Sequence, residues 1–135
     1  MNTESHCRIW RRCFMPLAEN VAEARHGAQL VLSTWAIPED TADTIALILT
    51  ELAANAVRHA RTPSRTFDVS LTYDGEKAVE VEVADGSPCR PVVKSFDPES
   101  TSGRGLLFVE ALADAWEVRE REFGKSVWAR ALVRS

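Results

Sequence analysis

Residues 51–60 read Glu-Leu-Ala-Ala-Asn-Ala-Val-Arg-His-Ala and lie in an apolar stretch with helical spacing. In a helix, residues four apart project from one face, so Glu51 and Asn55 lie one turn from each other. A carboxylate and an amide oxygen at that spacing suit a divalent cation, and the carboxylate can also accept a proton from a hydroxyl group. Taken alone, such a pair is more often ordinary helix surface, so the rest of the chain has to separate these two interpretations.

The helix around this pair is predicted to begin near residues 38–41, because proline and acidic residues favour a first turn. Its apolar stripe consists of Ile45, Ile48, Leu49, Leu52 and Ala56. At about 100° per residue, Glu51, Asn55 and Arg58 fall on one flank of that stripe and so border the core, which favours a site at the rim of a cleft. For Arg58, a salt bridge with Glu51 or an exposed position is at least as compatible as a phosphate contact. His59, at the edge of the stripe, fits a core-edge position better than a catalytic one.

Before this helix, residues 7–15 mix apolar and basic positions and are predicted to form an edge strand. One side of that strand would carry Arg8, Trp10, Arg12 and Phe14. Asn20, followed by Glu23 three residues later, has the form of a helix N-cap with a reciprocal carboxylate. Apolar residues at helical spacing then extend a first helix to Trp35, and the dipeptide at 37–38 closes it.

Two hairpins are predicted after the second helix. Residues 66–73 and 78–84 alternate like strands around an Asp-Gly-Glu-Lys turn, and residues 115–120 and 126–133 form a second pair. Between the hairpins, a stretch of about seventeen residues rich in Pro, Ser and Gly has no periodicity, which is typical of a functional lid. It ends in a Ser-Gly-Arg-Gly entry to a helix at 102–105, where free backbone N–H groups outline an anion site.

This element order predicts an α+β fold, a two-layer sandwich whose mixed, mostly antiparallel sheet is covered on one face by helices. The 135 residues fit a single domain, and the 45% hydrophobic and 27% charged residues fit a soluble globular protein. The net charge of -4 without a basic block argues against a nucleic-acid partner. The apolar runs are too short to span a bilayer, so a cytoplasmic location without membrane contact is expected. Cys7, Cys13 and Cys89 form no Cys-x-x-Cys motif, which favours reduced thiols.

Single motifs are weak here, but their order is specific. The Gly-x-Gly segment lacks the third glycine of a dinucleotide fingerprint, and no P-loop motif is present. However, the chain has a Glu-x-x-x-Asn-Ala helix, a strand ending in Asp-Gly-Ser-Pro, a lid, a Gly-Arg-Gly-Leu helix start and a terminal Gly-Lys-Ser-Val-Trp strand. In this order, from about Phe14 to Leu132, it resembles the GHKL (histidine-kinase-like, or Bergerat) ATPase fold. Within that fold it is similar to the small bacterial anti-sigma-factor serine/threonine kinases.

The resemblance implies roles for the helix and for the strand that follows. Asn55 matches the asparagine that holds the Mg²⁺ ion bridging the phosphates of ATP, and Glu51 matches the acidic residue taken as general base. Asp85 matches the aspartate that receives the adenine amino group, and Gly86 follows it in the same motif. Ser87 and Cys89 stand where the fuller family pattern has glycines, which predicts a stiffer lid hinge.

The resemblance also implies roles near the end of the chain. Gly103 and Gly105 match the glycines that turn backbone N–H groups toward the phosphates, with Arg104 as a charge partner and Leu106 opening the helix. Ser126 falls where the family often has a threonine near the adenine or its bound water.

The function implied by the resemblance is that of an ATP- and Mg²⁺-dependent serine/threonine kinase that phosphorylates an anti-sigma antagonist in trans and sequesters a sigma factor. The alternative is an ATP-binding regulatory module of the anti-sigma type with little or no kinase activity. An ATP hydrolase that drives a conformational cycle is a third and weaker hypothesis. The sequence leaves a homodimer open, and the first strand and first helix are the expected partner surface.

Overall fold

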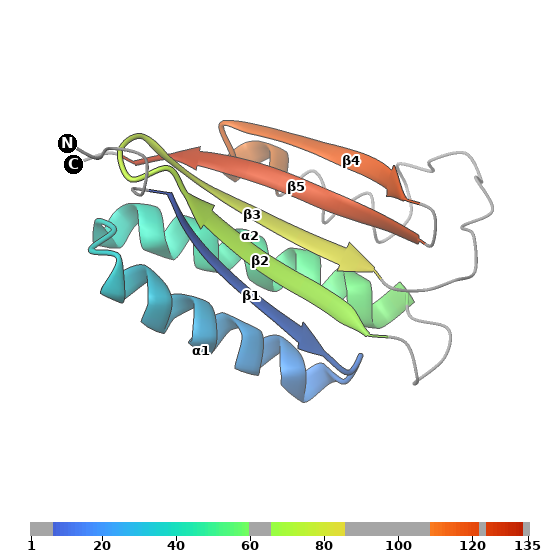
Figure 1. Cartoon of the computed structure of the whole chain (residues 1–135). Coiled ribbons are helices and arrows are strands. Elements are labelled where there is room, and N and C mark those ends of the chain that lie inside the picture. Colours follow the sequence, from blue (N-terminus) through green and yellow to red (C-terminus); the bar gives the residue numbers. More distant parts are fainter. Residues whose placement is uncertain (1–6, 60–65, 86–108, 122–123, 134–135) are drawn as a thin grey trace.

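The computed structural model describes residues 7–59, 66–85, 109–121 and 124–133 (Figure 1). Its elements are β1 (Arg8–Phe14), α1 (Ala18–Thr34), α2 (Glu39–His59), β2 (Phe67–Tyr73), β3 (Ala78–Asp85), β4 (Ala115–Arg121) and β5 (Gly124–Leu132). A short helical segment at 109–112 precedes β4. These bounds lie within two residues of those expected for the strands, and the hairpin of β2 and β3 is confirmed.

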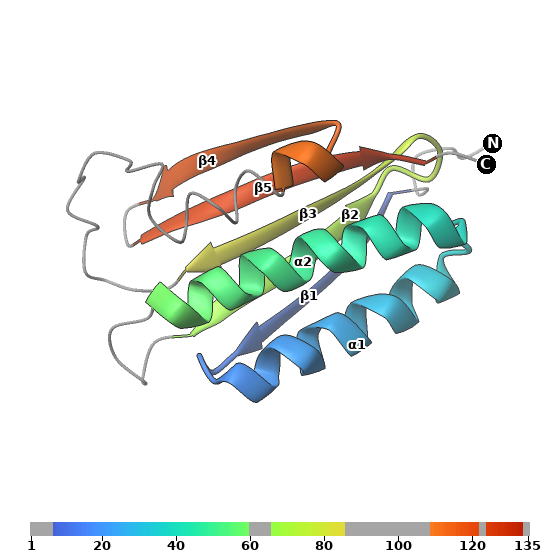
Figure 2. The same ribbon diagram turned by 180° about the vertical axis from the view of Figure 1, so that it is seen from behind.

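The strands form a five-stranded sheet in the order β1-β2-β3-β5-β4, and every pairing among them is antiparallel. Helices α1 and α2 lie side by side on one face of this sheet, as Figure 2 shows from the helical side. The predicted α+β two-layer sandwich is therefore confirmed. The expected mixed sheet is wrong, since the described strands pair only in antiparallel fashion. The face toward the viewer in Figure 1, called here the outer face, carries neither of these two helices.

The core lies between the helices and the sheet. Ile45, Ile48 and Leu49 of α2 have no exposed surface, and Leu52 is 2% exposed, so the predicted apolar stripe is confirmed. From the sheet, the alternating residues that face the helices are buried, and they are Phe67, Val69, Leu71, Val79, Val81 and Val83. Full burial of each large aliphatic side chain contributes about 1.5–3 kcal/mol, so this layer holds α2 firmly against β3.

The predicted N-cap of the first helix is wrong. Helix α1 begins at Ala18 after Leu17, which makes no side-chain cap. Asn20 instead lies inside the first turn, where its Nδ2 donates to the carbonyl of Met15 over 2.9 Å. The asparagine thus fixes the turn that leads from β1 into the helix, and α1 begins three residues earlier than the capping pattern indicates.

The other end of α1 closes with a Schellman motif. The N–H of Ala36 donates to Ser33 and that of Ile37 to Leu32, over 2.9 and 3.0 Å. Ala36 has φ 61°, the left-handed conformation that favours glycine. Apolar contact between the buried Leu32 and Ile37 accompanies this turn and holds the alanine in that conformation.

The hairpin between β2 and β3 is built around Asp74. Its Oδ1 accepts hydrogen bonds from the N–H groups of Glu76, Lys77 and Ala78 over 2.8, 2.7 and 3.2 Å. Slight burial opposes the ionised form, but these three donors and the charge of Arg130 together hold the pKa of Asp74 below its ordinary value.

Among the described residues, no helix is long and apolar enough to cross a membrane.

Candidate functional site

The C-terminal half of α2 and the C-terminal end of β3 lie at the same end of the molecule (Figures 1 and 2). Glu51 and Asn55 are half-buried on this part of α2, whereas Leu52 and Ala53 beside them are buried in the core. The helix is thus fixed by apolar neighbours at the positions where it presents a carboxylate and an amide. The predicted location of the polar pair at the rim of the core is confirmed.

Arg58 contacts Asn55. Its Nη1 donates to Asn55 Oδ1 over 2.8 Å, and the arginine is itself exposed. The sequence left three alternatives for Arg58: a phosphate contact, a salt bridge with Glu51, or an exposed position. The structure shows the exposed position, with Asn55 as the hydrogen-bond partner. The amide oxygen that would bind a cation therefore already faces a positive charge. His59 is the last residue of α2, and its side chain is not among those that the structure describes.

Asp85 is the last residue of β3 and lies on the face of the sheet that the helices cover, in the same row as Val81 and Val83. Its neighbour on β2 is Phe67, which is 1% exposed and stacks on Phe14 with ring centroids 5.4 Å apart. The half-buried carboxylate thus stands at the end of a rigid strand, between an aromatic core and the end of α2. A carboxylate in this position can accept a hydrogen bond from the amino group of a planar base.

The structure does not bring Ser126 to the side of Asp85. Ser126 pairs with Ala84 and faces the outer side of the sheet, where its Oγ donates to Glu82 Oε2 over 2.6 Å. Because side chains alternate along β5, the neighbouring Lys125 lies on the helical side, which is the side of Asp85. The alternation of Val127, Ala129 and Ala131, all packed in the core, was the sequence signal that places Lys125 rather than Ser126 on that side.

Five of the predicted nucleotide-binding residues lie outside the described residues, namely Gly86, Gly103, Arg104, Gly105 and Leu106. Ser87 and Cys89 of the expected lid lie outside them as well. The described chain resumes with the helical segment at 109–112, in which Val109 is fully buried. The anion site at this helix start stays a prediction.

The donor set fits Mg²⁺ bound together with phosphates. Within the described residues, no group of three or more His, Cys, Asp or Glu side chains could hold a metal ion alone. Mg²⁺ commonly takes one or two protein oxygens and completes its shell with phosphate and water. Asn55 Oδ1 supplies one such oxygen, which leaves the Glu51 carboxylate, one turn away, available as a base.

Comparison with known proteins agrees with this geometry. Residues 14–131 match the family model described as the histidine kinase-like ATPase domain, and the chain belongs to this family. A search of curated proteins found no match. Membership supports ATP as a ligand of this domain, with Mg²⁺ as its usual companion.

Solved structures share the fold at low identity. The structure of the RsbU and RsbW domains of a Mycobacterium tuberculosis protein matches with TM-score 0.73 and 17% identity, covering 94% of this chain and 32% of that one. The present chain thus spans about a third of that relative. A chain of the SiaB-SiaC complex from Pseudomonas aeruginosa matches with TM-score 0.59 and 16% identity, covering 93% of this chain and 90% of that one.

Proposed function

We propose that this chain is an ATP- and Mg²⁺-dependent regulatory serine/threonine kinase that phosphorylates an anti-sigma antagonist in trans and controls transcription by sequestering a sigma factor. The observation that carries the proposal is the position of Glu51 and Asn55 on α2, at the same end of the sandwich as Asp85 on β3. A base, a metal-binding amide and a reader of adenine are the groups that such a kinase needs at one end of its fold.

In this proposal the Asp85 carboxylate accepts a hydrogen bond from the adenine amino group and thereby orients the nucleotide. Asn55 Oδ1 would hold Mg²⁺, which would neutralise charge on the phosphates. Glu51 takes the proton of a serine or threonine hydroxyl on the partner. The hydroxyl oxygen then bonds to the γ-phosphorus, the bond from that phosphorus to the bridging oxygen breaks, and ADP leaves.

The partners in this proposal follow from the family resemblance. Support comes from the two solved relatives, which are described as RsbU and RsbW domains and as a SiaB-SiaC complex, so both occur with a second protein or domain. The likeness at this identity concerns the fold, and the sigma factor and the antagonist stay part of the proposal.

A second candidate is an ATP-binding module that exchanges partners with little phosphoryl transfer. The hydrogen bond from Arg58 to Asn55 Oδ1 favours it, because a guanidinium on that oxygen competes with the metal. Lys125 lies on the same side of the sheet as Asp85 and adds a second cation to that side. The hydrogen bond of Arg58 lowers the efficiency of a site that otherwise has the required groups.

Incubation with γ-labelled ATP, Mg²⁺ and the cognate antagonist separates the two candidates. For a kinase, label appears on the antagonist and is lost in Glu51→Ala, while ATP binding by the variant persists. Glu76→Ala is a matched control, because Glu76 is exposed in the distant β2–β3 turn and only its backbone N–H is engaged there. Tight ATP binding by the native protein without any labelled antagonist would exclude the kinase and leave the module.

A further inference from the structure

Strand β1 forms one edge of the sheet, and among the described residues no strand pairs with its free side (Figure 1). In an antiparallel pair, alternate residues direct both N–H and C=O away from the partner strand. Three or four of the seven residues of β1 therefore present unpaired backbone groups. Such an edge is a template for a further strand unless the sequence prevents it.

The charge of β1 is not compensated within the described part of the chain. The strand holds Arg8, Arg11 and Arg12 and no carboxylate, in a chain whose net charge is -4. The residues opposite these arginines on β2 are Tyr73, Ser70 and Val69. Among the described residues none of the three guanidinium groups is in an ion pair, and Arg12 lies over the ring of Phe14 at 4.9 Å.

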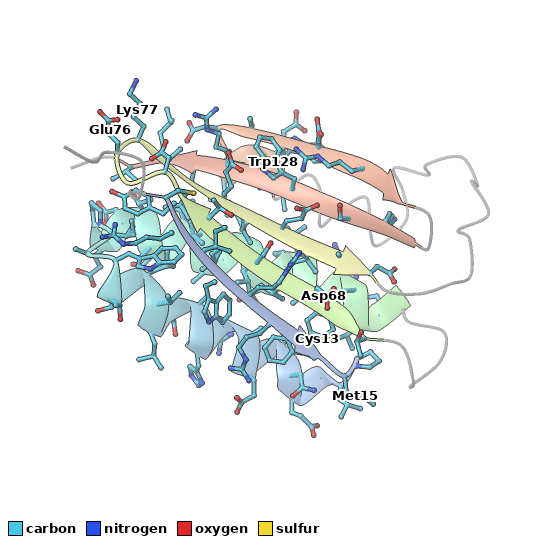
Figure 3. All side chains as sticks on the ribbon, in the orientation of Figure 1. Cys13, Met15, Asp68, Glu76, Lys77 and Trp128 are labelled. Atoms are coloured by element: carbon cyan, nitrogen blue, oxygen red, sulfur yellow. The ribbon has the colours of Figure 1, made fainter. Side chains whose placement is uncertain are left out.

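The opposite edge of the sheet differs. On β4, Arg119 donates to Glu117, lies 3.9 Å from Glu82, and stacks over Trp128 at 5.0 Å. Figure 3 shows Trp128 on the outer face above β5. Arg119 is thus satisfied by its own neighbours, whereas the three arginines of β1 are in no ion pair among the described residues.

We propose that an acidic, extended segment of a partner protein adds to the sheet along β1 as a further strand. Arg8 and Arg12 point to the helical side of the sheet and Arg11 to the outer side, so acidic residues on both faces of the segment find a guanidinium. Between them, Ile9 is 69% exposed on the outer face and offers an apolar contact. This surface does not depend on ATP binding.

A second copy of the chain fits this edge poorly. If two β1 strands paired antiparallel about Trp10, Arg8 of one copy would lie opposite Arg12 of the other, and Ile9 opposite Arg11. Like charges directly opposite each other destabilise a pair of strands. The same arginines that attract an acidic segment therefore oppose self-association through β1, a role that charged residues commonly have on sheet edges.

The test uses the whole chain and a labelled synthetic peptide in which pairs of adjacent glutamates, one on each face of an extended strand, are separated by valine or threonine. One control peptide carries lysine in place of glutamate. The other carries proline at alternate positions, so that it lacks the backbone N–H groups facing one side. Fluorescence anisotropy measures affinity, and amide hydrogen exchange by NMR locates the bound strand. One protein variant combines Arg8→Glu with Arg11→Glu. The control variant is Lys77→Glu, at an exposed residue of a turn.

The acidic peptide is expected to bind saturably, to protect alternate amides of residues 8–14, and to bind less tightly as salt increases. Reversal of both arginines should weaken it about tenfold or more, since each exposed pair contributes up to about 1 kcal/mol. Lys77→Glu should change the affinity less than about twofold. Each of three results would overturn the proposal: no saturable binding at millimolar peptide, equal binding of the proline peptide, or protection of β1 amides by the protein alone as its concentration rises.

Discussion

Ser126→Ala tests the assignment of this serine to the outer face of the sheet. Ser126 is 1% exposed, and its Oγ donates over 2.6 Å to a Glu82 carboxylate whose side chain is 27% exposed. A hydrogen bond to a charged group contributes about 1.5–3 kcal/mol, and partial exposure of the carboxylate favours the lower end. We therefore expect a loss of about 1.5 kcal/mol in the free energy of unfolding, which lowers the Tm by about 3–6 °C in a domain of this size.

Urea unfolding followed by circular dichroism measures that loss, and calorimetric titration with ATP and Mg²⁺ measures the affinity. Because the hydroxyl lies on the side of the sheet away from Asp85, the Kd for ATP should change less than about twofold. Glu82→Gln provides the second arm of a double-mutant cycle, with a coupling of about 1 kcal/mol expected between the two sites. An ATP affinity that falls about tenfold at unchanged stability would refute the outer-face position and restore the predicted contact with adenine.

Three further predictions concern Arg58, Asp74 and Ala36. Arg58→Ala frees Asn55 Oδ1, so Mg²⁺-dependent ATP binding measured by calorimetry should tighten several-fold. The free energy of unfolding should change by less than about 0.5 kcal/mol. A large loss of ATP affinity would instead make Arg58 a phosphate ligand. Asp74→Asn should destabilise the protein at neutral pH, because the lowered pKa of Asp74 contributes stability at pH values above the ordinary pKa of 3.8. The difference in unfolding free energy between the native protein and the variant should vanish as the pH falls through the folded-state pKa. Urea titrations at several pH values measure this difference, and a difference independent of pH would contradict the electrostatic cause. Ala36→Gly should stabilise by about 1 kcal/mol, since φ is 61° there; thermal unfolding at or below the wild-type Tm would argue against the left-handed conformation.

The fold was predictable because two periodicities dominate the sequence. Ile45, Ile48, Leu49 and Leu52 recur at helical spacing and are all buried, and the alternating valines of β3 face the same core. Apolar burial decides such elements, and the register of the sheet follows from which face packs. The N-cap of α1 was not predictable in the same way, since Asn20 had a competing acceptor in Met15 that only the turn after β1 brings within reach.

The candidate site was predictable on the helix and only partly on the strands. Glu51 and Asn55 follow from spacing along one helix, whereas Asp85 was assigned through the family resemblance, because Asp-Gly at a strand end is by itself usually a turn. The outer position of Ser126 depends on the pairing of β5 with β3, where a shift of one residue exchanges Ser126 for Lys125. The contact of Arg58 with Asn55 depends on side-chain conformation, which sequence spacing leaves open.

ATP is proposed to bind between the end of α2 and Asp85 of β3. The most direct measurement is the shift in Tm with millimolar ATP and Mg²⁺, for the native chain and for Asp85→Asn. A ligand that binds only the folded state at about 100 times its Kd adds about 2.7 kcal/mol, so the native protein should show a clear increase in Tm and the variant little or none. No increase in the native protein, or an equal increase in both, would contradict the account.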